Sequence, residues 1–351
     1  MFRHKTVMIV GAGASCEAKL PAGDELRVRI VNALRATDLH RSFHDVKISQ
    51  AIADISVKEG GAGQWPQIRA EYLAAAGNII SGLPLASSID HFLDAHAGNK
   101  RIELLGKLAI GSTILAAEKS SVLVTPGLGI VLDPDKIQNT WYAAFGRMVM
   151  QGVRRSDIRD IFKNLTIVSF NYDRCIEHFL FTALQSYFSV DAKAAAEALS
   201  ALTVIHPYGS LGSLPWQEGD IKVPYGVPED ANLLAIAGSL KTFTESIESG
   251  TANVIKEAVA SASTLIFLGF GFHPQNVDLL SVPTLTKAQC IFATMGGISA
   301  WDRPIARSLA ASIVNRSETG QFSIEVHAQS STCTALFDEY RLMLTQKLSL
   351  R

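Results

Sequence analysis

A short apolar strand that runs directly into a glycine-rich turn constrains the fold of this chain more than any other feature. Residues 6–10 read Thr-Val-Met-Ile-Val and are followed by Gly-Ala-Gly-Ala-Ser at 11–15. A continuous apolar run of this kind is typical of a parallel strand buried on both faces. The two glycines permit a tight turn in which a phosphate approaches backbone N–H groups. Cys16 replaces the third glycine of the dinucleotide fingerprint, so the same residues also suit a compact turn without a ligand.

Similar apolar runs recur much later in the chain. They lie at residues 165–170, 202–206, 264–270, 289–294 and 322–327. Helical patterns occur between them, notably at residues 173–188 and 191–201. Strands that alternate with helices favour a parallel sheet covered on both faces. The sequence therefore predicts an α/β class fold, a Rossmann-like doubly wound parallel sheet.

The interval between the first strand and the second is far longer than a crossover requires. It is mostly helical by pattern, and loops are expected at residues 60–63 and 125–129. We therefore expect a single domain over residues 1–351 with a helical insertion, or subdomain, at about residues 25–160. A C-terminal helix is expected within residues 331–351, over 333–348. The helices predicted inside the insertion span residues 24–39, 66–80, 89–95, 100–119 and 138–150.

Charge and composition give no sign of a nucleic-acid or membrane partner. The 32 Lys and Arg nearly balance the 33 Asp and Glu, and there is no basic block. No apolar stretch reaches the roughly 18 residues that a membrane span needs, and no secretory signal opens the chain. We expect a cytoplasmic protein. The mean hydropathy of +0.19 is high for a soluble monomer, which favours a homo-oligomer with some covered apolar surface.

The four cysteines are widely spaced and contain no C-x-x-C pair. They are Cys16, Cys175, Cys290 and Cys333. Such spacing predicts buried thiols, with neither a disulfide framework nor a metal site.

Polar residues or glycines follow three of the predicted strands. Asn171 and Asp173 come after the second strand, His206 after the third, and a glycine-rich segment at 269–271 after the fourth. Ligands of open parallel sheets bind at the carboxyl ends of the strands, so these residues are candidates for one site. Each also has a simpler interpretation. Asp173 suits an N-cap, Asn171 a turn, and His206 an ordinary strand end.

Together these motifs resemble the sirtuin-like superfamily, and its bacterial NAD-hydrolysing branch more than its protein deacylases. The resemblance covers almost the whole chain. The segments that carry it are residues 11–15 with Leu20 and Pro21, Ser-Ile-Asp-His-Phe-Leu at 88–93, Phe-Asn-Tyr-Asp at 170–173, His-Pro-Tyr-Gly-Ser at 206–210, and Gly-Phe-Gly at 269–271 with Asp278. Three departures stand out: the zinc ribbon of the deacylases is missing, Gly209 follows the histidine by three residues instead of one, and Leu20 replaces a glycine.

The resemblance implies cleavage of the nicotinamide–ribose bond of NAD⁺, which is the substrate, without a metal. The bond would break through an oxocarbenium-like state, and the pyridinium leaving group needs no strong acid. By resemblance, Asn171 orients the ribose and the attacking water, His206 acts as the general base, and Asp173 binds nicotinamide or orders its loop. Gly11, Ala12, Gly13 and Ser15 would approach the pyrophosphate, and Gly269, Gly271 and Asp278 the adenosine half.

The resemblance also implies a biological role as an effector of bacterial anti-phage defence that acts by NAD⁺ depletion. Control by assembly or by a separately encoded partner is expected, with an ATPase of the HerA helicase type as the candidate. Two other functions remain open from the sequence. One is transfer, as an NAD⁺-dependent deacylase or an ADP-ribosyltransferase, and the other is a non-catalytic module that senses NAD⁺ or ADP-ribose.

Overall fold

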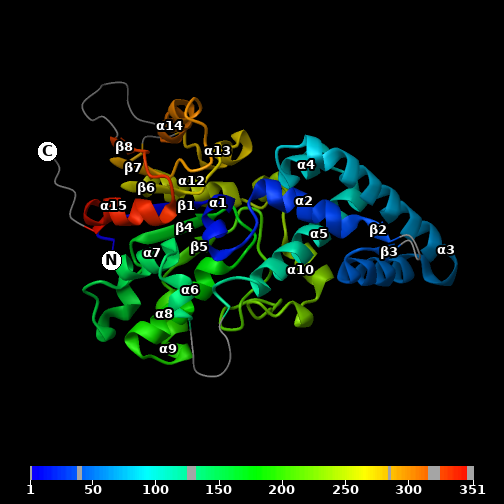
Figure 1. The fold of residues 1–351 in the computed structure, drawn as a ribbon, viewed down its shortest axis with the longest axis horizontal. Coiled ribbons are helices and arrows are strands. Elements are labelled where there is room, and N and C mark those ends of the chain that lie inside the picture. The colour runs from blue at the N-terminus through cyan, green and yellow to red at the C-terminus, as the bar shows by residue number, and fades with distance from the viewer. Residues whose placement is uncertain (1, 38–41, 125–131, 284–285, 315–324, 346–351) are drawn as a thin grey trace.

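A six-stranded, all-parallel sheet forms the centre of the described chain (Figure 1). The computed structural model describes residues 2–37, 42–124, 132–283, 286–314 and 325–345. The strands lie in the order β5–β4–β1–β6–β7–β8. When the six strands of this sheet are numbered in chain order, their order across the sheet is 3-2-1-4-5-6, that of the dinucleotide-binding fold. The predicted Rossmann-like, doubly wound α/β class is therefore confirmed. The bounds are β1 Thr6–Val10, β4 Leu165–Ser169, β5 Thr203–Ile205, β6 Thr264–Leu268, β7 Cys290–Ala293 and β8 Glu325–His327.

The predicted strands coincide with the observed ones, and their ends differ by a few residues. The first is identical, and its five residues are all buried. β6 stops at Leu268 because Gly269 turns into the left-handed region, with φ +55°. The first residues of the last predicted strand, 322–324, lie outside the described residues, and its remaining residues form β8.

Two groups of helices flank the sheet. One contains α7 (Trp141–Met150), α8 (Cys175–Phe188), α9 (Ala192–Leu199) and α15 (Cys333–Thr345); α7 packs against both α8 and α15. The other contains α12 (Thr251–Ser261), α13 (Pro274–Leu280) and α14 (Arg303–Ser312). From β1 the sheet is extended toward β5 on one side and toward β8 on the other. Because crossovers between parallel strands are right-handed, the helices that connect the strands on these two sides lie on opposite faces of the sheet. The predicted C-terminal helix is α15, and its last residues, 346–348, lie outside the described residues.

A lobe of helices extends from one end of the sheet, at the right of Figure 1. It contains α2 (Gly23–Leu34), α3 (Val46–Gly82), α4 (Ile89–Ala95), α5 (Lys100–Lys119) and α10 (Leu233–Ser239), which pack around α5. A hairpin of β2 (Ala36–Thr37) and β3 (Ser42–Phe43) joins α2 to α3. The predicted helical insertion at about residues 25–160 lies in two places: its first part forms this lobe, whereas α7 packs against the sheet body.

Short elements complete the described chain. They are α1 (Ala12–Ser15), η1 (Cys16–Ala18), η2 (Leu83–Leu85), α6 (Pro134–Ile137), η3 (Arg155–Asp160), η4 (Pro228–Asp230) and α11 (Phe243–Glu248).

The loop expected at residues 60–63 is instead a break within a long helical span. Helix α3 continues from Val46 to Gly82, and only Gly61 leaves helical geometry, with φ 53° and ψ −151°. Glycine alone adopts such a conformation at little cost, so the two helical segments meet at a kink and need no loop. Pro66 lies inside the helical span, five residues after this break. The other expected loop, at 125–129, lies outside the described residues.

A buried ion pair fastens the lobe to the sheet body. Glu118, near the end of α5, contacts Arg174, just before α8, and the two side chains are 0% and 1% exposed. Nη2 and Nε of the arginine donate to the two carboxylate oxygens at 2.5 and 3.2 Å, and Nη1 donates to the carbonyl of Val223. Since Arg174 directly follows Asp173, the pair also fixes the loop that carries the candidate site residues.

Among the described residues, no helix combines the length and the apolar character needed to cross a membrane.

Candidate functional site

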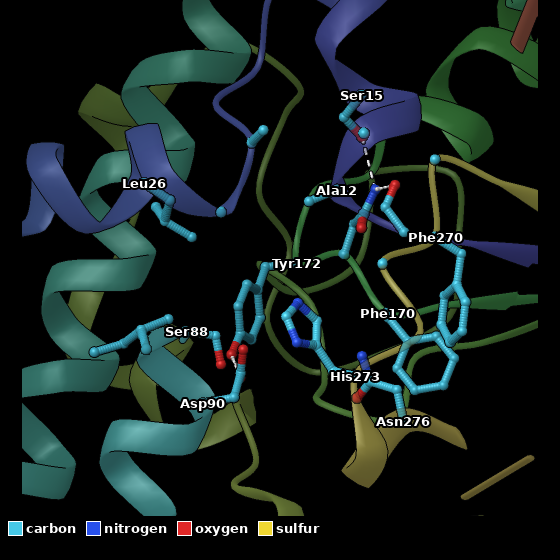
Figure 2. Close-up of a pocket in the computed structure, with 18 of the residues that line it drawn as sticks. Ala12, Ser15, Leu26, Ser88, Asp90, Phe170, Tyr172, Phe270, His273 and Asn276 are labelled. Atoms are coloured by element: carbon cyan, nitrogen blue, oxygen red, sulfur yellow. Dashed lines mark hydrogen bonds between the residues drawn. The ribbon is translucent and has the colours of Figure 1, made fainter. Parts of the chain in front are cut away.

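A cavity of about 740 Å³ lies at the carboxyl ends of β1, β4 and β6, where the strand order reverses. Doubly wound sheets bind their ligands at this position. The sheet loops form one wall, with residues of the segments 11–15, 170–173 and 269–276, and the helical lobe forms the other, with Leu26, residues 87–91 and Ile114. Figure 2 shows the two walls facing each other. The volume falls within the range of about 300–1,000 Å³ that is usual for small-molecule sites.

Three of the predicted site residues that line the cavity meet in one hydrogen-bonded group. The hydroxyl of Ser15 donates to Oδ2 of Asp173 at 2.7 Å and accepts from Nδ2 of Asn171 at 2.8 Å. Nδ2 of Asn171 also donates to the carbonyl of Gly11 at 3.0 Å. Both amide hydrogens are thus used, which fixes the orientation of the side chain. Oδ1 of Asn171 is buried and has no partner among the described residues.

Asp173 combines the capping role with a contact inside the site. Its Oδ1 accepts from the backbone N–H of Cys175 at 3.1 Å, at the beginning of α8, while Oδ2 holds Ser15. The capping interpretation is correct in part, although the residue that precedes the helix is Arg174. Because both of its oxygens are engaged, Asp173 fixes the loop between β4 and α8.

The predicted glycines bring two strand-end loops into direct backbone contact. The N–H of Gly13 donates to the carbonyl of Gly269 at 3.1 Å, and the N–H of Gly11 donates to Leu268 at 2.9 Å. A Cβ on Gly269 would lie 2.0 Å from the nitrogen of Ala14, and one on Gly11 would lie 2.6 Å from the carbonyl oxygen of Gly269. These glycines therefore permit the close packing of the β1 and β6 loops, and their backbone forms part of the cavity surface together with Ala12 and Gly271.

His206 lies behind the cavity, outside the residues that line it. Its Nδ1 is 3.0 Å from the backbone carbonyl of Asn171, and its Nε2 is 2.8 Å from Oε1 of Glu177 on α8. Burial alone would lower the pKa of His206, but the carboxylate of Glu177 and the Asn171 carbonyl outweigh it and raise the pKa above the usual value. The pKa of Glu177 is lowered, because the histidine outweighs the effect of its burial. Nδ1 faces a carbonyl oxygen and Nε2 a carboxylate oxygen, so neither ring nitrogen is left free toward the cavity.

Asp278 stands apart from the other predicted residues. It is exposed on α13 and does not line the cavity. The structure therefore brings together Gly11, Ala12, Gly13, Ser15, Asn171, Asp173, Gly269 and Gly271 around the cavity, and places His206 and Asp278 outside its lining.

Asp90 and Tyr172 form a contact across the cavity that the sequence analysis did not single out. Asp90 lies in the first turn of α4 on the lobe, and Oδ1 of its carboxylate accepts a hydrogen bond from the Tyr172 hydroxyl (Figure 2). Ser88 caps the same helix by accepting from the N–H of His91. Burial raises the pKa of Asp90, and burial together with the neighbouring carboxylate raises that of Tyr172. In the sequence, the segment 88–93 could have drawn attention to Asp90, because it is one of the segments that carry the family resemblance.

Aromatic side chains form another part of the cavity lining. The ring of Phe170 lies 5.3 Å from that of Phe270 and 5.9 Å from that of Tyr208, centroid to centroid. The Tyr208 hydroxyl donates to Oδ1 of Asn276 at 2.6 Å. These rings suit a planar group, and the polar atoms at their edges can fix its orientation.

The charged groups around the cavity are unevenly distributed. Three aspartates, Asp24, Asp90 and Asp173, line it together with His91 and His273, and none of the described lining residues is Lys or Arg. A phosphate at this site would therefore bind through backbone N–H groups and hydroxyls, whereas a cationic ring would find carboxylates and aromatic faces. Across the described residues, no cluster of three or more His, Cys, Asp or Glu is arranged to hold a metal ion.

No protein-family model matches the chain, and no curated protein matches it in sequence.

Proposed function

We propose that this protein is an NAD⁺ glycohydrolase, which cleaves the bond between nicotinamide and ribose. The observation that carries the proposal is the buried, unpartnered Oδ1 of Asn171 beside the cavity. A buried acceptor without a partner costs about 1–3 kcal/mol, so it suits a donor that a bound molecule or a water brings. A ribose hydroxyl and an attacking water are both such donors.

The charge of the cavity supports a cationic leaving group. The nicotinamide ring of NAD⁺ carries a positive charge until the bond to ribose breaks. Tyr172 and Tyr208 offer aromatic faces, and Asp90 offers a carboxylate near them. These groups attract the pyridinium, while the glycine loops leave room for the pyrophosphate against the backbone.

His206 contributes to this proposal as a positioning residue. Its Nδ1 is hydrogen-bonded to the backbone carbonyl of Asn171, and Glu177 holds the ring from the other side. The contacts from Glu177 to His206 and from His206 to the Asn171 carbonyl thereby fix the backbone that carries the Asn171 side chain. Removing the imidazole would release this loop, so activity would depend on His206 even though its ring lies outside the cavity lining.

The test is release of nicotinamide from NAD⁺, measured for the wild type and two variants over a range of protein concentrations. Asn171→Ala is expected to lower kcat by about 10²–10³-fold, the usual effect of removing one orienting polar group. Asn32→Ala is the control, because Asn32 is exposed on α2. Equal activity of all three proteins, or no release by the wild type at any concentration, would contradict the proposal.

A second candidate is an NAD⁺ or ADP-ribose sensor without catalysis. The observation that favours it is the engagement of both ring nitrogens of His206, which leaves neither of them free toward the cavity. A sensor would bind NAD⁺ in calorimetry and return it unchanged after prolonged incubation. Detectable nicotinamide above the uncatalysed background would exclude this candidate.

A further inference from the structure

The cavity holds three carboxylates, and only one of them is placed to take a proton from a bound molecule. Asp173 uses both oxygens, on Ser15 and on the N–H of Cys175. Asp24 is 92% exposed and pairs with Arg27. Asp90 accepts from Tyr172 through Oδ1, and its Oδ2 has no side-chain partner among the described residues. Asp24 and Asp90 thus each keep an oxygen without a side-chain partner among the described residues, but only Asp90 is partly buried and held by a second wall of the cavity.

The position of Asp90 is also fixed from both walls. Its backbone belongs to the first turn of α4, which Ser88 caps, and its side chain is tied to Tyr172 on the sheet body. Tyr172 directly follows Asn171, whose Oδ1 is the unpartnered acceptor of the same cavity. A group held in this way loses little freedom when a substrate binds, which favours proton transfer. The exposed ring of His273 also lines the cavity, but no hydrogen bond to a described residue holds it.

We propose that Asp90, contributed by the helical lobe, is the general base that accepts the proton of the attacking water, with Tyr172 holding its carboxylate in place. The inference rests on the proposed NAD⁺ cleavage. The C1′–N bond breaks and its electron pair goes to the ring nitrogen, which releases neutral nicotinamide. The water oxygen bonds to C1′, and its proton passes to Oδ2 of Asp90 and then to solvent. The products are ADP-ribose, nicotinamide and one proton.

The decisive variant is Asp90→Asn, which keeps the shape and the acceptor for Tyr172 but removes the base. We expect kcat to fall by about 10²–10⁴-fold, the usual contribution of a positioned base. Asp94→Asn is the matched control: it lies one turn further along α4, where it accepts from Gln275 and Thr244 and does not line the cavity. An equal loss in both variants would show that the effect is structural and would overturn the assignment.

Two further readouts separate a base from a merely structural residue. Formate, a small carboxylate, should restore release by Asp90→Ala at millimolar concentration and leave Asp94→Asn unchanged. The acid limb of kcat against pH should also disappear in Asp90→Asn. The titratable groups that face Asp90 are the phenols of Tyr172 and Tyr208, and the cavity also holds Asp24, Asp173, His91 and His273.

The possible outcomes distinguish the two proposals. If the wild type releases nicotinamide, Asp90→Asn lowers the rate and formate restores release by Asp90→Ala, the assignment of Asp90 as the base is supported. If the wild type releases nicotinamide and Asp90→Asn releases it equally fast, the assignment of the base is overturned while the proposed hydrolase activity stands. Loss of the acid limb in His273→Gln instead would transfer the role to that histidine. No release by the wild type overturns the hydrolase and the base together.

Discussion

Substituting Glu118 by glutamine should destabilise the protein far more than the same change at an exposed ion pair. A glutamine side chain has nearly the same volume as glutamate and keeps one acceptor oxygen. Its NH₂ group, however, would stand where Oε2 of Glu118 now accepts a hydrogen bond from Nη2 of Arg174 at 2.5 Å. The guanidinium is 1% exposed and would keep its charge without a counter-ion. Breaking a buried pair in this way costs about 3–5 kcal/mol.

Glu25→Gln is the matched control, because Glu25 pairs with Arg29 across one turn of α2 and both side chains are well exposed. Its expected cost is below about 1 kcal/mol. Urea unfolding followed by circular dichroism would give the free energy of unfolding for both variants and the wild type. A loss in Glu118→Gln no larger than that in Glu25→Gln would refute the idea that this pair fastens the lobe to the sheet body.

Two further predictions concern the loops and the buried histidine. Gly269→Ala should lower the free energy of unfolding by more than about 2 kcal/mol and abolish NAD⁺ binding in calorimetry, since the left-handed backbone alone costs about 1–2 kcal/mol and the new Cβ would overlap the nitrogen of Ala14. Gly77→Ala is the control and should lower neither, because Gly77 is exposed on α3, does not line the cavity, and a Cβ there meets nothing within 4 Å. Glu177→Gln should destabilise the protein most between pH 4.5 and 6.5, which are the ordinary pKa values of Glu177 and His206. The raised pKa of His206 gives a stabilisation that is full below pH 6.5 and is lost as the pH rises through the pKa of the folded state. The lowered pKa of Glu177 gives a stabilisation that is present above pH 4.5 and is lost as the pH falls through the pKa of Glu177 in the folded state. Unfolding curves from pH 4 to 9 would check this, and a pH-independent loss would contradict it.

The sequence predicted the sheet and the position of the cavity because both depend on local patterns. Continuous apolar runs identify buried parallel strands, and the residues that follow them must gather at one edge. Asn171, Asp173 and the glycines of both loops are found there for that reason. The contact between Gly13 and Gly269 joins residues 256 positions apart, and no local pattern predicts it.

The direction in which His206 faces could not be predicted from the sequence. It depends on Glu177, which is carried by a helix whose rotation is set by its packing against α7 and α9. Asp90 was missed for a related reason. Its place beside Tyr172 follows from how the lobe lies over the sheet, which depends on helix–helix packing and on the buried pair of Glu118 and Arg174.

The meeting of the two glycine loops has a consequence for how such a protein can change over evolutionary time. Where Gly11 and Gly13 meet Gly269, the cavity surface is main chain; a Cβ added at Gly11 or Gly269 would overlap backbone atoms, and one at Gly13 would press tightly against them. A substitution at these glycines would therefore disrupt this part of the cavity surface and could not alter its shape gradually. The lobe has no such restriction at residues 87–91, where side chains supply the surface. Descendants that acquire a new ligand preference should carry their substitutions in the lobe and keep the glycines unchanged.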